Sequence, residues 1–259
     1  MAVKRIKGAK RKQVKQPRPP IAWKSHLRKA GLLLVMVTLI SGGVYLQRDE
    51  TFPILHVSVE GDFTHTDKEA LVKAVSPYAQ GGFMHVDVAS IKRAGESLPW
   101  VNVVQVRRLW PDTLHLIVIE QEALALWGKN SLVNSEGQVF LPPINTIPSG
   151  LSLLEGPKGT NVLMSQHFKQ MKEQLATVGL NLRSVRMDER RSWNLLLSND
   201  VELILGRADS ELRLQRFVQL YDGALMPYRE NIARVDMRYT NGLSVTWKQD
   251  QIPDFNGTV

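Results

Sequence analysis

The residues that could hold a metal ion lie scattered along this sequence of 259 residues. The six histidines are His26, His56, His65, His85, His115 and His167. No two of them are spaced as H-x-H or H-x-x-x-H, the spacings that place two imidazoles on one metal ion. There is also no cysteine, which excludes a thiolate site and a disulfide framework. The sequence therefore predicts neither a metal site nor a cofactor.

Groups that could carry out catalysis are equally sparse. The chain contains no G-x-S-x-G, S-x-x-K, G-x-G-x-x-G or G-x-x-x-x-G-K-[ST] motif, so nothing indicates an activated serine or a phosphate-binding loop. The carboxylate pairs Asp188/Glu189 and Glu120/Glu122 fall at the expected ends of strands, where solvated or structural charges are the ordinary case. We predict no catalytic residues and no enzymatic activity.

Basic residues are concentrated at the N-terminus. Of the 33 lysines and arginines, 11 lie in residues 1–29, which contain no acidic residue. The remaining 22 basic and 25 acidic residues give the rest of the chain a net charge of −3. The overall charge of +8 therefore does not describe a basic globular surface and does not indicate nucleic-acid binding. Arg190-Arg191 suits the carboxylates of a protein partner, which guanidinium groups can bind in pairs of hydrogen bonds.

The apolar segment after the basic region predicts a membrane anchor. Residues 30–46, AGLLLVMVTLISGGVYL, carry no charge, and such a segment spans about 26 Å as a helix. The basic cluster before it predicts a cytoplasmic N-terminus, with the residues after Arg48 outside. A cleaved signal peptide, with Ser41-Gly42-Gly43 near the cleavage site, is the alternative. The lengths of the basic region and of the apolar segment favour the anchor.

Residues 52–122 predict a small β-α-α-β-β domain, with two helices on one face of a three-stranded sheet. Thr66 and Glu69 have the spacing of a capping box, so a helix is expected to start at Thr66. Asp87 precedes apolar residues spaced by three and four, which predicts a second helix. The strands expected are 54–59, 101–109 and 114–120, the last two joined as a hairpin at 110–113.

Residues 123–250 predict a mostly antiparallel β domain with flanking helices at 165–178 and 210–221. Residues 142–159 contain four prolines and three glycines and are expected to form a loop. The last two strands are expected to meet at Asn241-Gly242, a dipeptide typical of two-residue hairpin turns. The strands expected are 124–127, 131–134, 138–141, 182–188, 193–197, 201–205, 232–239 and 243–248.

The predicted fold class is α+β, because runs of strands and separate helices alternate without the regular βαβ pattern of a parallel sheet. The predicted organisation is a cytoplasmic basic tail (1–29), a transmembrane helix (30–46), a linker (47–51), a first domain (52–122), a β domain (123–250) and a flexible tail (251–259).

Eight short motifs follow one another along these domains. They are Leu98-Pro99-Trp100-Val101, Val106-Arg107-Arg108, Trp110-Pro111-Asp112, Val133-Asn134-Ser135-Glu136-Gly137, Arg190-Arg191-Ser192-Trp193, Leu205-Gly206-Arg207, Arg216-Phe217-Val218 and Val235-Asp236-Met237-Arg238-Tyr239. In this order, after a basic tail and a single span, they make residues 25–250 resemble the FtsQ/DivIB family of bacterial cell division proteins. In that family the β-α-α-β-β unit is a POTRA domain.

The resemblance implies a non-enzymatic scaffold of the divisome that links early to late division proteins and helps to control septal cell-wall synthesis. It implies a single-pass type II protein of the inner membrane, at the division septum, with both domains in the periplasm. The implied partners are FtsB and FtsL, with further contacts to FtsK, FtsW, FtsI and FtsN.

The resemblance also implies two partner-binding sites. The FtsB contact would use the last strand of the β domain and a nearby arginine, which places it at Arg190, Arg238, Tyr239, Asn241, Gly242 and Leu243. The targeting strand of the POTRA domain would be 101–109, with Val103, Gln105 and Arg107. An edge strand has unpaired N–H and C=O groups to which a partner segment can add. The alternative is that Asn241-Gly242 is only a turn and Tyr239 only a core residue.

The sequence departs from the usual family pattern at two positions. Ala123 replaces a frequent proline, and Asn134 replaces an acidic residue at the start of a turn. Both positions fall at the expected junction of the two domains, so the sequence does not determine the angle between them.

Two further hypotheses about function stay open on the sequence. A POTRA-type periplasmic chaperone or transport module would normally need repeated POTRA units and a barrel after them, whereas one unit is predicted here. A membrane-tethered hydrolase would be supported by turnover of peptidoglycan by the exported part of the chain.

Overall fold

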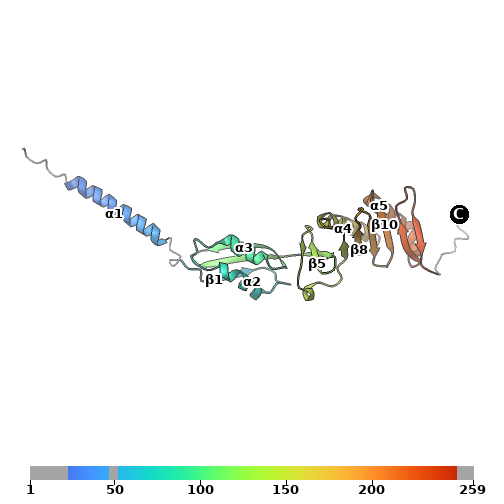
Figure 1. Cartoon of the computed structure of the whole chain (residues 1–259), viewed down its shortest axis with the longest axis horizontal. Coiled ribbons are helices and arrows are strands. Elements are labelled where there is room, and N and C mark those ends of the chain that lie inside the picture. The colour runs from blue at the N-terminus through green and yellow to red at the C-terminus, as the bar shows by residue number, and fades with distance from the viewer. Residues whose placement is uncertain (1–22, 47–51, 250–259) are drawn as a thin grey trace, which may run out of the picture.

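The computed structural model describes residues 23–46 and 52–249 (Figure 1). Most of the predicted basic tail, the predicted linker 47–51 and the predicted tail 251–259 lie outside the described residues. Within them, the structure contains one long N-terminal helix and two sheets of three and nine strands. The predicted α+β class is confirmed.

Helix α1, Trp23–Leu46, carries no charged residue from Ala30 onward and is exposed along its described length. Residues His26–Tyr45 have a mean hydropathy of 1.6 and are long enough to cross a bilayer. The described helix begins at Trp23, seven residues before the predicted start of the span. The end of the predicted basic tail, Lys24 to Lys29, is therefore helical as well. Helix α1 fits a single membrane span.

The first domain has the predicted β-α-α-β-β order. Its elements are β1 (His56–Glu60), α2 (Lys68–Val75), the short 3-10 helix η1 (Ser76–Tyr78), α3 (Val88–Glu96), β2 (Val101–Leu109) and β3 (Thr113–Glu120). The sheet order is β1-β3-β2, with β1 parallel and β2 antiparallel to the central β3. Leu71 and Ile91 on the helices pack with Val104 and Leu116 on the strands, so both helices cover the same face.

The first helix of this domain starts one residue later than predicted. Asp67, not Thr66, is its N-cap, and Asp67 Oδ1 accepts a hydrogen bond from the N–H of Glu69 at 3.0 Å. The N–H of Thr66 instead donates to Glu120 Oε1 at 2.6 Å. The predicted cap Asp87 is confirmed, since its Oδ1 accepts from the N–H groups of Ala89 and Ser90.

The second domain is built on a single nine-stranded sheet. In chain order its elements are β4 (Ala123–Trp127), β5 (Ser131–Asn134), β6 (Val139–Phe140), η2 (Ile144–Thr146), β7 (Leu153–Glu155), α4 (Asn161–Ala176), β8 (Leu182–Met187), β9 (Trp193–Leu197), β10 (Glu202–Gly206), α5 (Ser210–Leu220), η3 (Tyr221–Leu225), η4 (Met226–Tyr228), β11 (Ile232–Asp236) and β12 (Ser244–Trp247). The strand order is β12-β11-β10-β9-β8-β7-β4-β5-β6, and five of its eight pairings are antiparallel.

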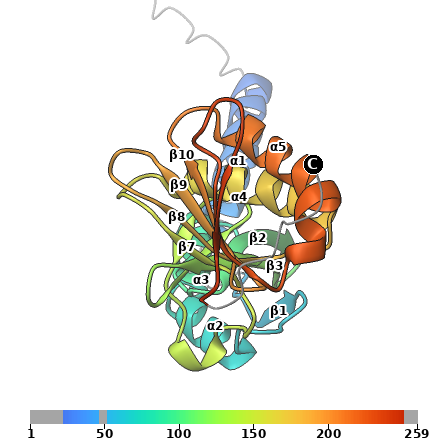
Figure 2. The ribbon, with the colours of Figure 1, turned by 90° about the vertical axis from the view of Figure 1, so that its right-hand side faces the viewer.

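Helices α4 and α5 lie on the same side of this sheet (Figure 2). Phe168 on α4 and Phe217 on α5 are almost completely buried and belong to one core with Leu195 and Leu203 on the strands. The opposite face is polar. Arg186 pairs there with Glu155, and other ion pairs lie beside it. One covered face and one solvated face explain the alternating pattern on which the strands were predicted.

The prediction of a loop over 142–159 is wrong in one respect. Leu153–Glu155 form β7, which runs parallel to both β4 and β8 and so joins the two halves of the sheet. Three residues are too few to show a strand periodicity, and their partners are far away in the sequence. Helix α4 also begins four residues before the predicted Ser165, after the buried Thr160.

The two domains meet around the buried side chain of Trp100. Its Nε1 donates to Thr146 Oγ1 at 2.8 Å, and its ring lies 5.2 Å from that of Phe140. On its other side it stacks on His65, with centroids 4.0 Å apart. These contacts join both domains, which only Gln121 and Glu122 connect along the chain.

Asn134 adds a second connection at the same junction. Its Oδ1 accepts from the N–H groups of Glu136 and Gln138, which closes the β5–β6 turn. Its Nδ2 donates to Gln121 Oε1 at 2.8 Å. An aspartate at this position has no N–H to donate, so the asparagine of this chain provides a contact that the acidic residue could not make to Gln121.

Glu120 ends β3 beneath the loop that leads into α2. Its carboxylate accepts hydrogen bonds from the N–H groups of Thr64, His65 and Thr66. Partial burial acts to raise the pKa of the Glu120 carboxyl, but hydrogen bonds from Thr66, and then from Thr64 and His65, outweigh it. The net pKa lies below the ordinary value, so the ionised carboxylate stabilises the fold.

We expect Glu120→Gln to destabilise the first domain by about 1–2 kcal/mol at neutral pH, because a charged acceptor of several N–H groups becomes neutral. The folded pKa is lowered, so this stabilisation is complete above the unfolded pKa of about 4.3 and is lost as the pH falls through the folded value. The difference from wild type should shrink in acid. Urea-dependent hydrogen exchange in residues 52–122 measures it.

Glu122→Gln is the matched control, because Glu122 is exposed and lies two residues further along the chain. Equal stability of the Glu120 and Glu122 variants at pH 7 would contradict the role assigned to Glu120.

Candidate protein-binding edge of the β domain

The register of the nine-stranded sheet gathers several predicted site residues at one end of it. Trp193 at the start of β9 lies opposite Gly206, and Asp236 at the end of β11 lies beside both Ile204 and Ser244. The β8–β9 turn, the end of β10 and the β11–β12 loop are therefore at the same end of the sheet. Arg190 lies in the turn, and Arg238 to Leu243 lie in the loop.

Strand β12 is an edge of this sheet. It pairs with β11 on one side, and no other strand of the described residues pairs with it on the other. The N–H of Lys248 donates to Asn231 O at 2.7 Å, toward β11. Since N–H groups alternate in direction along a strand, that of Val245 points away from β11. The outer side of β12 therefore offers the N–H of Val245 as a donor for an added strand.

The predicted hairpin around Asn241-Gly242 is wrong in its geometry. Strand β11 ends at Asp236 and β12 begins at Ser244, which leaves a loop of residues 237–243. Gly242 does not take the left-handed conformation that a two-residue type I′ turn requires. The predicted residues Tyr239, Asn241, Gly242 and Leu243 thus lie beside the last strand rather than in it.

Arg216 on α5 explains why the loop takes this longer path. Its Nη2 donates to the carbonyl oxygens of Met237 at 3.1 Å and Tyr239 at 2.8 Å, and its Nη1 donates to that of Thr240. The N–H of the buried Met237 continues the ladder toward Ile204. The first residues of the loop are therefore held against β10 and α5, not paired with β12.

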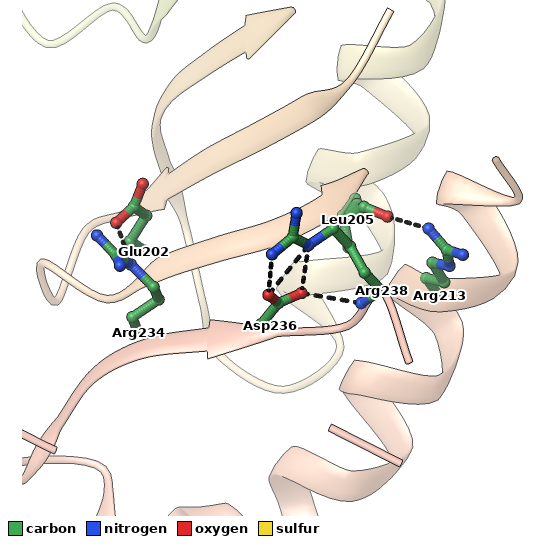
Figure 3. A network of polar contacts seen from close by, with 6 residues as sticks. All are labelled: Glu202, Leu205, Arg213, Arg234, Asp236 and Arg238. Carbon is green, nitrogen blue, oxygen red and sulfur yellow. Dashed lines mark hydrogen bonds and ion pairs between the residues drawn. The ribbon is translucent and has the colours of Figure 1, made fainter. Parts of the chain in front are cut away.

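Arg238 forms an ion pair with Asp236 at the end of β11 (Figure 3). Its Nη2 lies 2.6 Å from Asp236 Oδ2, and its Nε lies 3.0 Å from both carboxylate oxygens. Hydrogen bonding by Arg238 is the largest cause of a lowered pKa of the Asp236 carboxyl, ahead of an opposing contribution from burial. The guanidinium side chain is still 60% exposed, so a partner can reach it.

Gly206 makes room for this arrangement. It has a φ of +77°, and a Cβ built on it would lie 3.0 Å from Arg238 Cγ and 2.9 Å from Arg213 Nη1. Arg213 in turn donates to the carbonyl oxygen of Leu205 at 2.6 Å. Figure 3 shows Arg238 beyond the end of β11 and Arg213 reaching from α5 to Leu205 on β10, with the Arg234–Glu202 pair further along the same strands.

Arg190 is exposed in the β8–β9 turn. Asp188 Oδ1 accepts from the N–H groups of Arg190 and Ser192, and Arg191 takes a φ of 65°, so the turn is well defined. This turn leads into β9, and β10 lies between β9 and β11, which separates β9 from β11 by about 10 Å at the usual strand spacing. Arg190 and Arg238 are thus neighbouring positive charges rather than one pair.

The remaining predicted residues of the loop differ in exposure. Tyr239 is 58% exposed, and Asn241 is exposed, whereas Leu243 is half-buried and packs against the core. Tyr239 therefore suits a contact with a partner, which goes against its alternative reading as a core residue. Leu243 instead attaches the loop to the core of the β domain.

The predicted strand of the first domain also lies at an edge. Among the strands that the structure describes, β3 is the one partner of β2. Gln105 and Arg107 are exposed and Val103 is half-buried, on the sheet face away from the helices.

Sequence reasoning assigned no role to Arg216 or Asp236, although both stand in the quoted motifs. Their contacts join elements far apart in the chain, and no local spacing shows them.

Among the described residues, no three histidine or acidic side chains gather as a metal site would require.

Comparison with known proteins agrees with this architecture. The family model for the C-terminal part of the cell division protein FtsQ/DivIB matches residues 125–238, and that for the FtsQ-type POTRA domain matches residues 52–121. The chain belongs to the FtsQ/DivIB family. The C-terminal match ends at Arg238, so the rest of the loop and β12 lie beyond it.

Relatives named cell division protein FtsQ are similar to the chain over most of its length. The relative from Coxiella burnetii is 33% identical, with 83% of this chain and 89% of the relative covered. That from Hahella chejuensis is 34% identical, covering 86% and 78%, and that from Neisseria gonorrhoeae is 31% identical, covering 86% and 92%. The chain is therefore a cell division protein with an FtsQ-type POTRA domain.

We expect Arg216→Ala to release the β11–β12 loop, because three backbone carbonyls lose a charged donor, each contact being worth about 1.5–3 kcal/mol. Hydrogen-exchange mass spectrometry should show lower protection in residues 237–243 and unchanged protection in β8 and β9. Arg229→Ala is the control, because Arg229 forms an exposed pair with Glu230. Unchanged protection of the loop would show that Arg216 does not hold it.

Proposed function

We propose that the chain is a non-enzymatic scaffold of the bacterial divisome that binds FtsB, together with FtsL, along the free edge of β12. The observation that carries the proposal is the position of β12 at the edge of the nine-stranded sheet formed by the described residues, with the N–H of Val245 directed outward. Adding a strand to such an edge gives a partner main-chain hydrogen bonds that need no particular sequence.

Side chains around the edge would supply specificity. Tyr239 offers a rigid exposed aromatic ring next to β12, of the type that often dominates binding energy. Arg190 and Arg238 would face acidic residues of the partner, with Arg238 held in position by Asp236. Asn241 and Gly242 in the same loop leave room for the partner backbone.

The membrane arrangement supports this role. The 11 basic residues before the apolar helix favour a cytoplasmic N-terminus, so both domains would lie in the periplasm. The protein would be a type II single-pass protein of the inner membrane at the septum. In this position it would link early to late division proteins and help to control septal cell-wall synthesis.

The first domain would supply the other set of contacts. Val103, Gln105 and Arg107 on the edge strand β2 would take part in targeting to the septum. The upstream protein FtsK, and FtsW, FtsI and FtsN, are the further partners that family membership suggests. One POTRA-type sheet occurs in the described chain, and nothing in it favours a transport module of repeated POTRA units.

The strand proposal is tested by Val245→Pro in the full-length chain. Proline removes the outward N–H of Val245 and leaves the ladder to β11 intact, so we expect co-purification with FtsB to be lost. Val245→Ala is the matched control, because it removes side-chain packing but keeps the N–H. Equal recovery of FtsB with both variants would show that the edge of β12 is not the binding site.

Tyr239→Ala tests the side-chain contact separately. A hot-spot aromatic is worth about 2 kcal/mol, so we expect affinity for FtsB to fall about 30-fold by calorimetry, with the thermal stability of the β domain unchanged. Leu212→Ala is the control, since Leu212 is 64% exposed on α5. Leu243 is unsuitable for this test because it packs against the core. Unchanged affinity would remove Tyr239 from the site.

A further inference from the structure

Large apolar side chains are exposed together at one end of the first domain. They come from three segments that are separate in the sequence and include the most exposed tryptophan of the described chain. We call this set the apolar tip; its members, with their exposed fractions, are Leu55 (65%), Tyr78 (49%), Met84 (60%), Leu109 (48%) and Trp110 (75%).

The topology of the small sheet brings these segments together. Strands β1 and β3 are parallel and start at the same end, where the β2–β3 hairpin also turns. The N–H of Leu55 donates to Asp112 O at 3.0 Å, and the rings of Phe52 and Trp110 lie 6.5 Å apart. The N–H of Phe83, next to Met84, donates to Phe52 O at 2.7 Å. The three segments thus form one surface around Phe52.

This surface follows directly after the membrane span. Helix α1 ends at Leu46, and the described chain resumes at Phe52. Six residue steps reach at most about 20 Å when fully extended. If α1 spans the bilayer, Phe52, which the apolar tip surrounds, must therefore lie within this distance of the end of α1. The far end of the same sheet, where β3 ends at Glu120, leads away into the β domain.

The chemistry of the surface suits a lipid interface. Tryptophan and tyrosine concentrate at the level of lipid headgroups, because their rings are apolar with one polar group. Arg107 is exposed beside the tip, and Arg108 is held in place by donating to Val86 O at 3.0 Å. Long basic side chains at such a border can reach phosphate groups while their stems cover apolar surface.

We propose that the apolar tip inserts into the headgroup layer of the membrane that α1 spans, and so fixes the orientation of the first domain on that membrane. The proposal rests on α1 as a membrane span, and it is independent of the partner proposed for β12. A second contact with the bilayer, in addition to α1 itself, would limit the tilt and rotation of the domain. The contacts of Trp100 and Asn134 would pass this orientation on to the β domain.

Spin labelling of the full-length chain in lipid nanodiscs tests the insertion. The chain has no cysteine, so Met84→Cys provides a single labelling site at the tip. Ile144→Cys is the matched control, because Ile144 is 75% exposed on the second domain. We expect the ratio of collision rates with oxygen, which concentrates in lipid, and with a water-soluble nickel complex to be several-fold higher at position 84.

A second variant keeps the test specific. Adding Trp110→Ser to the Met84→Cys chain should lower this ratio toward that of the control, with an unchanged circular dichroism spectrum. Equal ratios at positions 84 and 144 would overturn the proposal by placing the tip in water. A label at position 84 protected from both reagents would overturn it as well, since the tip would then be covered by protein. Neither result depends on whether FtsB binds.

Discussion

The β domain depends on the two parallel pairings made by three residues, Leu153–Glu155. Through them β7 joins a sheet of three N-terminal strands to a sheet of five C-terminal strands. Without these pairings β4 and β8 would each expose an edge, and the core under α4 would be open on one side. The pairings of β7 also fix where β12 lies, because they join the five C-terminal strands to β4 and so to the junction with the first domain.

The sequence predicts those parts of the fold that local patterns encode. Alternating apolar residues in 182–205 predict β8, β9 and β10, and the apolar spacing after Asp87 predicts α3 with its cap. Strand β7 could not be predicted from such patterns, because its three residues are too few to show a periodicity and the strands it pairs with lie far along the chain. The start of α2 differs by one residue for a similar reason. The local capping box competes with Glu120, a residue more than 50 positions away, and the distant carboxylate takes the N–H of Thr66.

The candidate site shows the same division between local and distant information. Family motifs direct attention to Arg190, Arg238 and Tyr239, and the structure places all three at one end of the sheet. The dipeptide Asn241-Gly242 is misleading, since its local preference for a tight turn is overridden by Arg216 from another helix. Asp236 is similar: only the folded structure shows that it both orients Arg238 and neutralises part of its charge. Residues that support a site from behind therefore need the fold to be recognised.

The contacts between the domains at Trp100 have a geometric consequence. They set the two sheets one after the other along the long axis of the protein, with α1 at one end and β12 toward the other (Figure 1). If α1 spans the bilayer and the domains extend away from it, the edge of β12 would stand above the membrane by about the length of two domains. A partner anchored in the same membrane can pair with β12 only if its own extracellular stem is long and stiff enough to rise to that level. For the binding mode proposed above, the height of β12 would thus select partners in addition to their sequence, and a shortened stem would abolish pairing even if every contacting residue were intact.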